Sequence, residues 1–270
     1  MESCCICGTV KNCEPYLKNV FKNIKKITKL FKDYYIIIYY DTSTDNTLEI
    51  LNKYKEKNKK IYIYHNNIYY SKYRTHRLAF GRNFCLNIIK SKFADFKYFI
   101  MMDFDDVSSN NINISVLEKH IINDKLWDAL SFNKSTYYDL WALSVSPYVV
   151  SYAHFQNYTN VVNEMQKYIT NKLNTMDKNS LLPCYSAFNG FSIYKTNIFI
   201  NCVYDGNMRL DLIPEQYITD TIRRNKSNIV FNNNLSWLSS KNEDCEHRSF
   251  HFDAINKYNA NIYISPEILF

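Results

Sequence analysis

The chain has 270 residues, 46% of them hydrophobic, which is enough for one large α/β domain with a sizeable core. Its net charge of +7 comes with an excess of Lys, Asn, Ile and Tyr that is typical of an AT-rich genome, such as a viral one, and no compact Lys/Arg patch predicts nucleic-acid binding. No apolar run has the length of a transmembrane segment and the N-terminus has no secretion signal, which predicts a cytoplasmic protein, in the host cytoplasm if viral.

Strand and helix patterns alternate through the first hundred residues. Apolar runs predict buried strands at Ser3–Val10, Tyr35–Tyr40, Ile61–Tyr64 and Tyr98–Met102. Apolar side chains at helical spacing predict a helix after each of the first three strands. This alternation predicts an α/β fold with a doubly wound, mostly parallel sheet, flanked by helices, in a single domain over residues 1–270.

The eight cysteines are predicted to be structural. Cys4-x-x-Cys7 has the spacing of half a zinc site, but no second pair follows at a suitable distance. Because both lie in a predicted buried strand, we expect reduced thiols that pack as small hydrophobic side chains.

The most informative stretch follows the strand at 98–102. Asp103, Asp105 and Asp106 place three carboxylates within four positions, on a loop past the carboxyl end of a strand, where open α/β sheets bind ligands. Asp103 and Asp105 alternate along the chain, so both can face one divalent cation with oxygen ligands. The alternative is an acidic loop, or a set of helix caps for the residues that follow.

Two further polar segments lie at predicted strand ends. Ser43, Thr44 or Asp45 suffices to cap the helix after the second strand, so Asp41 is expected to stay free for a ligand. Arginines ahead of the acidic loop, starting with Arg74, are candidates for binding phosphate oxygens through paired N–H groups, although lone arginines are usually surface residues.

Four segments in order carry a resemblance to a known family. They are Gly8–Leu17, Tyr40–Thr47, Gly81-Arg82-Asn83 and Asp103-Phe104-Asp105. Together they resemble GT-A nucleotide-sugar glycosyltransferases of the family 2 type, which bear an Asn-Glu-x-x-x-Leu start, an Asp-Asp-x-Ser-x-Asp-x-Thr loop and a metal-binding Asp-x-Asp. The chain departs from that pattern at Tyr40, where the family often has Asp, and at Cys13, inserted between Asn12 and Glu14.

The resemblance implies a UDP- or GDP-linked sugar donor bound by residues 1–110. The residues that it implies for the sugar donor are Thr9, Val10, Asn12, Asp41, Arg74, Arg82, Asn83 and Phe104. Asp103 and Asp105 would hold Mn²⁺ or Mg²⁺ against the diphosphate, where the ion acts as a Lewis acid on the leaving group.

Residues 111–270 are expected to bind the acceptor, a glycan or glycoprotein. A strand is predicted at Trp127–Phe132, and Tyr137–Leu143 resembles a Tyr-Asp-x-x-Ala-Leu segment of capsule-type mannosyltransferases, with Asp139 as its one acid. Residues 144–180 are predicted to be an irregular insertion around a helix near Val161–Ile169.

Residues 242–251 form the last polar cluster, ahead of a predicted helix at Phe252–Tyr258. In GT-A enzymes a Glu-Asp-x-x-Phe motif commonly stands here, and Glu246-His247-x-x-Phe250 fits its frame. Glu246 or Asp244 is then a candidate general base, and His247 a third metal ligand beside Asp103 and Asp105. The alternative is a helix N-terminus whose acids complement the helix dipole.

These expectations lead to a metal-dependent glycosyltransferase that moves a sugar onto a hydroxyl acceptor. Two other classes stay open: a catalytically inactive relative that still binds nucleotide sugar, and a metal-dependent nucleotidyltransferase, which also pairs carboxylates with a divalent ion on an α/β sheet.

Overall fold

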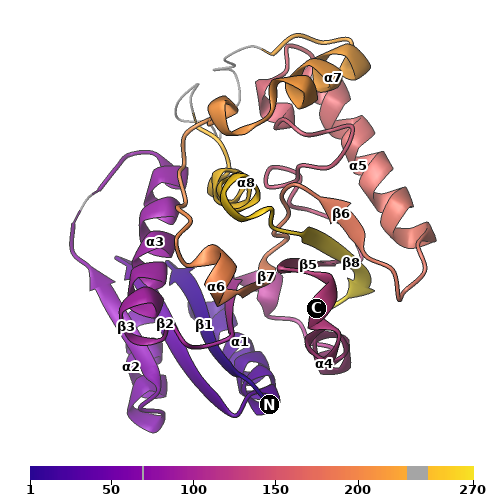
Figure 1. Cartoon of the computed structure of the whole chain (residues 1–270). Coiled ribbons are helices and arrows are strands. Elements are labelled where there is room, and N and C mark those ends of the chain that lie inside the picture. The colour runs from indigo at the N-terminus through magenta and orange to yellow at the C-terminus, as the bar shows by residue number, and fades with distance from the viewer. Residues whose placement is uncertain (69, 230–242) are drawn as a thin grey trace.

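The computed structural model describes residues 1–68, 70–229 and 243–270 (Figure 1). Its strands form one eight-stranded sheet in the order β3-β2-β1-β4-β7-β5-β8-β6. The strands are β1 (Ser3–Val10), β2 (Asp33–Asp41), β3 (Ile61–Asn66), β4 (Tyr98–Met102), β5 (Ala129–Asn133), β6 (Leu182–Cys184), β7 (Phe191–Lys195) and β8 (Ile262–Ile268). The helices are α1 (Glu14–Ile27), α2 (Thr47–Lys57), α3 (Arg74–Lys92), α4 (Ile114–Ile122), α5 (Tyr158–Thr175), α6 (Thr196–Phe199), α7 (Glu215–Asn225) and α8 (Glu246–Tyr258).

The predicted single α/β domain with a mostly parallel sheet is confirmed. β3, β2, β1 and β4 are parallel neighbours, and β5 runs parallel to β8. β7 lies antiparallel between β4 and β5, and β6 closes the far edge antiparallel to β8. The first four strands thus form the parallel half of the sheet, and the remaining strands extend it as a mixed half.

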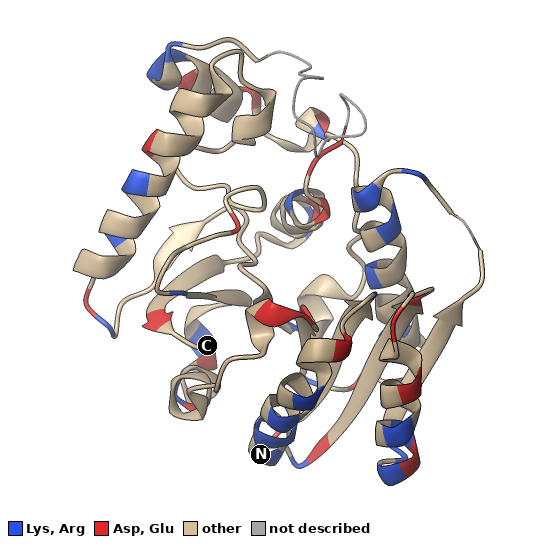
Figure 2. Cartoon of the chain, turned by 180° about the vertical axis from the view of Figure 1, so that it is seen from behind, with Lys and Arg blue, Asp and Glu red and all other residues tan. Residues whose placement is uncertain are grey.

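Helices cover both faces of the sheet (Figure 1). α1, α2 and α4 pack on one face, where their apolar side chains share a core with alternate residues of β1, β2 and β4. α3 packs on the other face against the intervening residues of β1 and β2, α5 packs there over β8, and α8 lies beside α3 in the same core. Figure 2 shows Lys and Arg on the outer sides of the helices near the N-terminus, so these charges are a solvated surface.

Strand register brings the polar strand ends together. Val10 pairs with Tyr40, and Cys7 pairs with Met101, so β1, β2 and β4 end side by side. Parallel neighbours present their carboxyl ends at one edge, and that edge therefore carries both Asp41 and the loop that starts at Asp103.

The helix expected near Val161–Ile169 is confirmed and extends over Tyr158–Thr175. Two predicted boundaries in the second half are wrong. The strand expected at Trp127–Phe132 is β5, Ala129–Asn133. The last helix begins at Glu246 instead of Phe252. Its first turn is buried although it carries charged side chains, so the amphipathic pattern that marks a surface helix is missing there.

All eight cysteines are buried and free, in agreement with the prediction of structural thiols. Among the described residues, no helix combines the length and the apolar character needed to cross a membrane.

Candidate active site

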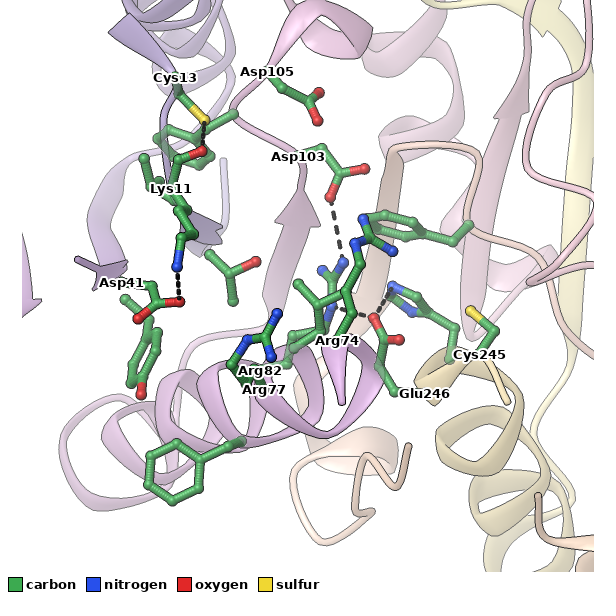
Figure 3. Close-up of a pocket in the computed structure, with 18 of the residues that line it drawn as sticks. Lys11, Cys13, Asp41, Arg74, Arg77, Arg82, Asp103, Asp105, Cys245 and Glu246 are labelled. Carbon is green, nitrogen blue, oxygen red and sulfur yellow. Dashed lines mark hydrogen bonds and ion pairs between the residues drawn. The ribbon is translucent and has the colours of Figure 1, made fainter. Parts of the chain in front are cut away.

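A cavity of about 470 Å³ opens at the carboxyl ends of β1, β2 and β4 (Figure 3). The predicted site residues that line it are Thr9, Val10, Asn12, Asp41, Arg74, Arg82, Asp103, Phe104, Asp105, Glu246 and His247. Two predicted residues, Asn83 and Asp244, do not line it. Figure 3 shows Asp41 and Lys11 on one side of the cavity and Glu246 on the other, with Asp103 and Asp105 between them.

Asp41 is held in place by two neighbours. Lys11 Nζ donates to Asp41 Oδ2 over 3.1 Å, and Asn66 Nδ2 donates to Asp41 Oδ1 over 3.3 Å. Asp41 was expected to stay free for a ligand, and these two donors already occupy part of its acceptor capacity. The carboxylate is nevertheless oriented toward the cavity by groups at the ends of β1 and β3, which fixes its position for a ligand.

The two loops beside Asp41 tie α1 and α2 together. Asp45 Oδ2 accepts from the backbone N–H of Glu14, and Glu14 Oε2 accepts from the backbone N–H of Asn46. Asn12 Oδ1 accepts from Thr44 N over 2.8 Å. Asp45 thus satisfies the first N–H of α1, and Glu14 at the start of α1 binds the N-cap residue of α2. Asn12 joins the two loops, so it contributes to the cavity wall mainly as a structural residue.

Asp103 is paired with a cationic side chain, whereas Asp105 is not paired with any among the described residues. Arg82 Nη2 lies 3.3 Å from Asp103 Oδ1, whereas Asp105 accepts from the backbone N–H of Val107 and has no ion pair among the described residues. Burial, together with the nearby charge of Asp103, raises the pKa of Asp105 to about 6. The pair is therefore a concentration of negative charge that a cation would relieve.

Arg82 connects the two halves of the chain. Its Nε donates to Glu246 Oε1 over 2.8 Å, and its guanidinium stacks 4.7 Å from the centre of the Phe188 ring. Burial opposes the charge, but Glu246 and Asp103 outweigh it and raise the pKa of Arg82. Gly81 lets α3 come this close to the sheet, since a Cβ there would lie 2.7 Å from Thr9 Cγ2.

The other predicted arginines and Asn83 have separate surroundings. Arg74 lines the cavity at the start of α3. Arg77, which the sequence analysis did not single out, also lines it and donates to the carbonyls of Ser71 and Lys72. Asn83 instead binds the backbone of Tyr204 through both ends of its amide, at 2.8 and 2.9 Å. We infer a structural role for Asn83.

His247 is buried between two aromatic rings. Its ring stacks on Phe188 at 3.8 Å between centroids and meets Tyr204 edge-on at 5.3 Å. Burial and the charge of Arg82 lower the pKa of His247 well below its ordinary value. Neither ring nitrogen has a hydrogen-bond partner in the described part of the chain, and no group of three potential metal ligands is assembled there.

Tyr138 and Asp139 form a second wall of the cavity, with Asn189 behind it. Asn189 has φ +53° and accepts from the backbone N–H groups of both residues, while Asp139 Oδ2 accepts from the Asn189 N–H over 3.2 Å. Gly190 follows at φ +84°, and a Cβ there would lie 2.3 Å from Val107. This anchoring of Asp139 through the turn at Asn189 and Gly190 could not be seen in the sequence pattern.

Lys134 is another residue near the acids that the sequence analysis missed. Its ammonium lies 5.5 Å from the centre of the Tyr138 ring and donates to the carbonyl of Val107. Burial lowers the pKa of Lys134 to about 8, although the charges of Asp103 and Asp105 act to raise it. A lone Lys after a strand gives no sequence signal for such a position.

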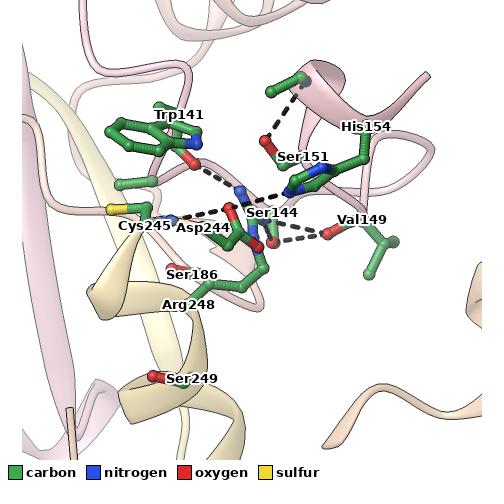
Figure 4. A network of polar contacts seen from close by, with 12 residues as sticks. Trp141, Ser144, Val149, Ser151, His154, Ser186, Asp244, Cys245, Arg248 and Ser249 are labelled. Atoms are coloured by element: carbon green, nitrogen blue, oxygen red, sulfur yellow. Dashed lines mark hydrogen bonds and ion pairs between the residues drawn. The ribbon is translucent and has the colours of Figure 1, made fainter. Parts of the chain in front are cut away.

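Asp244 lies in a buried network behind the cavity (Figure 4). Its Oδ2 accepts from Arg248 Nε over 2.9 Å, and its Oδ1 lies 4.0 Å from His154 Nε2. Arg248 also donates to the carbonyls of Trp141, Leu143 and Val149 and to the Ser144 hydroxyl. Asp244 and Arg248 thus hold the segment that carries the wall residues Asp139 and Trp141.

Comparison with known proteins adds the family. No curated protein sequence matches the chain. Among solved structures, S. aureus TarS matches all of this chain at 15% identity and a TM-score of 0.50, and this chain spans 36% of that one. The structure of S. aureus TarS 1-349 is 16% identical with a TM-score of 0.48, and the match covers 100% of this chain and 59% of that one. The mannosyltransferase PcManGT from Pyrobaculum calidifontis is 12% identical with a TM-score of 0.41, and the match covers 73% of this chain and 45% of that one.

At these identities the likeness to solved structures concerns the fold alone. The model of glycosyl transferase family 2 matches residues 5–189, which is more than half of the chain and includes the strand ends that form the cavity. The chain therefore belongs to glycosyl transferase family 2.

Proposed function

We propose that the chain transfers a sugar from a UDP- or GDP-linked donor to a hydroxyl of a glycan or glycoprotein, in a reaction that needs Mn²⁺ or Mg²⁺. The observation that carries this proposal is the cavity lining from Asp41 to Asp105, in which a fixed carboxylate is followed by two neighbouring carboxylates, Asp103 paired with Arg82 and Asp105 without an ion pair among the described residues. In a family 2 member this spacing suits a nucleoside at Asp41 and a diphosphate near Asp105.

The residues present fit a divalent cation. Asp103 and Asp105 offer carboxylate oxygens, which Mn²⁺ and Mg²⁺ accept as ligands. Asp105 has no ion pair among the described residues, and burial together with the charge of Asp103 raises its pKa, so a cation would stabilise its charged form. A bound ion would stabilise charge on the departing nucleoside diphosphate. His247 is proposed as a third ligand because its imidazole is neutral and neither nitrogen has a hydrogen-bond partner among the described residues. Its Nε2 lies 3.8 Å from Glu246 Oε1, and joining Asp103 and Asp105 at one ion would need a rearrangement, since no three-ligand group is assembled in the described part of the chain.

The first half of the chain is proposed to bind the sugar donor and the second half the acceptor. In residues 1–110, Thr9, Val10 and Phe104 shape the nucleotide pocket, and Arg74 and Arg82 bring positive charge toward the diphosphate. Residues 111–270 supply the acceptor side, with Glu246 on the cavity wall. Of the two base candidates from the sequence, Glu246 is the one that lines the cavity.

A panel of UDP- and GDP-sugars tests the proposal, with the metal ion present and water or simple sugars as acceptors. Release of nucleoside diphosphate from one donor is expected. Release of pyrophosphate would instead indicate a nucleotidyltransferase, and tight binding of a donor with no turnover would indicate an inactive relative.

We predict that Asp41→Asn weakens binding of the free nucleoside diphosphate roughly 10- to 100-fold, the equivalent of about 1.5–3 kcal/mol for a hydrogen bond to a charged group. Isothermal titration calorimetry measures this directly. Asp33→Asn is the matched control, because Asp33 lies at the opposite end of β2 and is also paired with a lysine, Lys60. Equal affinities of wild type and Asp41→Asn would remove Asp41 from the nucleotide site.

A further inference from the structure

The carboxylates of the cavity differ in whether a cation accompanies them. Those that line it are Asp41, Asp103, Asp105, Asp139 and Glu246. Lys11 pairs with Asp41, and Arg82 pairs with both Asp103 and Glu246. Asp105 and Asp139 have no ion pair among the described residues. Since Asp105 belongs to the proposed metal pair, Asp139 is the cavity carboxylate that remains without an assigned role.

Asp139 is rigidly oriented and keeps acceptor capacity. Its Oδ1 accepts from Ala142 N and its Oδ2 from Asn189 N, both over 3.2 Å. A carboxylate has about four lone-pair sites, so sites remain for a hydroxyl proton. Burial raises the pKa of Asp139 to about 6, with the charges of Asp103 and Glu246 acting in the same direction. A carboxylate of this basicity accepts a proton near neutral pH better than an ordinary one.

Its place in the fold puts Asp139 next to the reacting end of a sugar donor. Along the sheet, Asp41 follows β2, Asp103 follows β4, and Asp139 is anchored to Asn189 just ahead of β7, the neighbour of β4. The Tyr138 hydroxyl lies within 3.5 Å of Asp103 Oδ2. Asp139 thus lies on the side of the diphosphate site away from Asp41, where the transferred sugar and its acceptor would meet.

The two candidate bases predicted from the sequence, Glu246 and Asp244, are both already in ion pairs with buried arginines. Glu246 Oε1 accepts from Arg82, and the Glu246 side chain is 3% exposed. Asp244 is paired with Arg248 outside the cavity lining. An acid that pairs with a buried guanidinium loses that ion pair on taking up a proton, and in a buried site this loss is costly.

We propose that Asp139 is the general base of the transfer reaction, an inference that rests on the proposed function. Its carboxylate takes the proton of the acceptor hydroxyl, whose oxygen forms a bond to the anomeric carbon of the sugar. The bond from that carbon to the diphosphate oxygen breaks, and its electron pair leaves with the nucleoside diphosphate. Tyr138 and Trp141 flank the base on the cavity wall and supply apolar faces for a sugar ring.

The test uses the sugar donor that the wild-type protein turns over, with water as the acceptor. Asp139→Asn is expected to lower kcat for nucleoside diphosphate release by roughly 10²–10⁴-fold, the usual contribution of general-base catalysis. Binding of UDP or GDP is expected to be unchanged, because Asp139 lies away from the nucleoside. Retention of most of kcat in Asp139→Asn would overturn the inference.

Chemical rescue separates a base from a structural residue. Formate is expected to restore turnover of Asp139→Ala in a concentration-dependent way, because it fits the vacated volume and accepts a proton. Glu246→Ala is the matched comparison and is expected to show no rescue. Rescue of Glu246→Ala instead would assign the base to Glu246. A wild-type protein that releases no nucleoside diphosphate from any donor would overturn the proposed function, and the inference with it.

Discussion

Asp105→Ala is expected to lower the release of nucleoside diphosphate by roughly 10³-fold, because a Lewis-acid contribution of about 4 kcal/mol to the transition state is lost. Asp105 is a half-buried carboxylate of the proposed metal pair and has no ion pair among the described residues, so its removal takes away a ligand without leaving a stranded cation. The fold is therefore expected to persist. EDTA is expected to abolish turnover of the wild type, and Mn²⁺ or Mg²⁺ to restore it.

Asp106→Ala is the matched control for this variant. Asp106 belongs to the same acidic run, but it is exposed and does not line the cavity. Binding of Mn²⁺ in the presence of UDP or GDP, followed by electron paramagnetic resonance, provides a readout independent of turnover. We expect Asp105→Ala to lose this binding and Asp106→Ala to keep it. Full activity of Asp105→Ala in EDTA would contradict the proposed metal site.

The parallel half of the fold was predictable because its signals are local. Buried apolar runs mark β1 and β4, and β1 was predicted with its observed bounds, Ser3–Val10. Each of these strands ends where polar residues begin, and parallel strands carry their ends to one edge. Asp41 and Asp103 could therefore be assigned to one site from the sequence alone.

Contacts between distant segments could not be predicted in the same way. Asp45 has the sequence signature of a local helix cap, yet it also accepts from Glu14, 31 residues earlier. Arg82 and Glu246 are 164 residues apart and meet only because α3 and α8 pack on the same face of the sheet. No periodicity in the sequence encodes such a pair.

The start of α8 could not be predicted from the sequence pattern either. Glu246, His247 and Arg248 are consecutive polar residues, and all three are buried. A sequence that buries its polar residues looks like a surface loop, and Cys245 at the N-cap makes no side-chain capping bond. Because the residues lie on a helix, Glu246 and His247 are about 100° apart around its axis. Both therefore reach the cavity, which an extended loop would prevent.

Arg248 organises this helix start, and Arg248→Met is expected to lower the free energy of unfolding by about 3–5 kcal/mol, the usual cost of removing one partner of a buried ion pair. The Arg248 side chain is 4% exposed, and its loss leaves the Asp244 carboxylate buried without its cation. It also leaves the carbonyls of Trp141, Leu143 and Val149 without their shared hydrogen-bond donor (Figure 4). Urea denaturation followed by circular dichroism measures the change.

Arg209→Met is the matched control, because Arg209 pairs with Asp205 and Asp211 in an ion pair whose arginine side chain is 38% exposed. Exposed pairs of this kind contribute about 1 kcal/mol or less. Adding Asp244→Asn to Arg248→Met is expected to recover part of the lost stability, since the stranded charge is then removed. If the double variant is as unstable as the sum of the two single ones, the two side chains are not coupled. The hydrogen bonds from Arg248 to the 141–149 segment would then account for its effect.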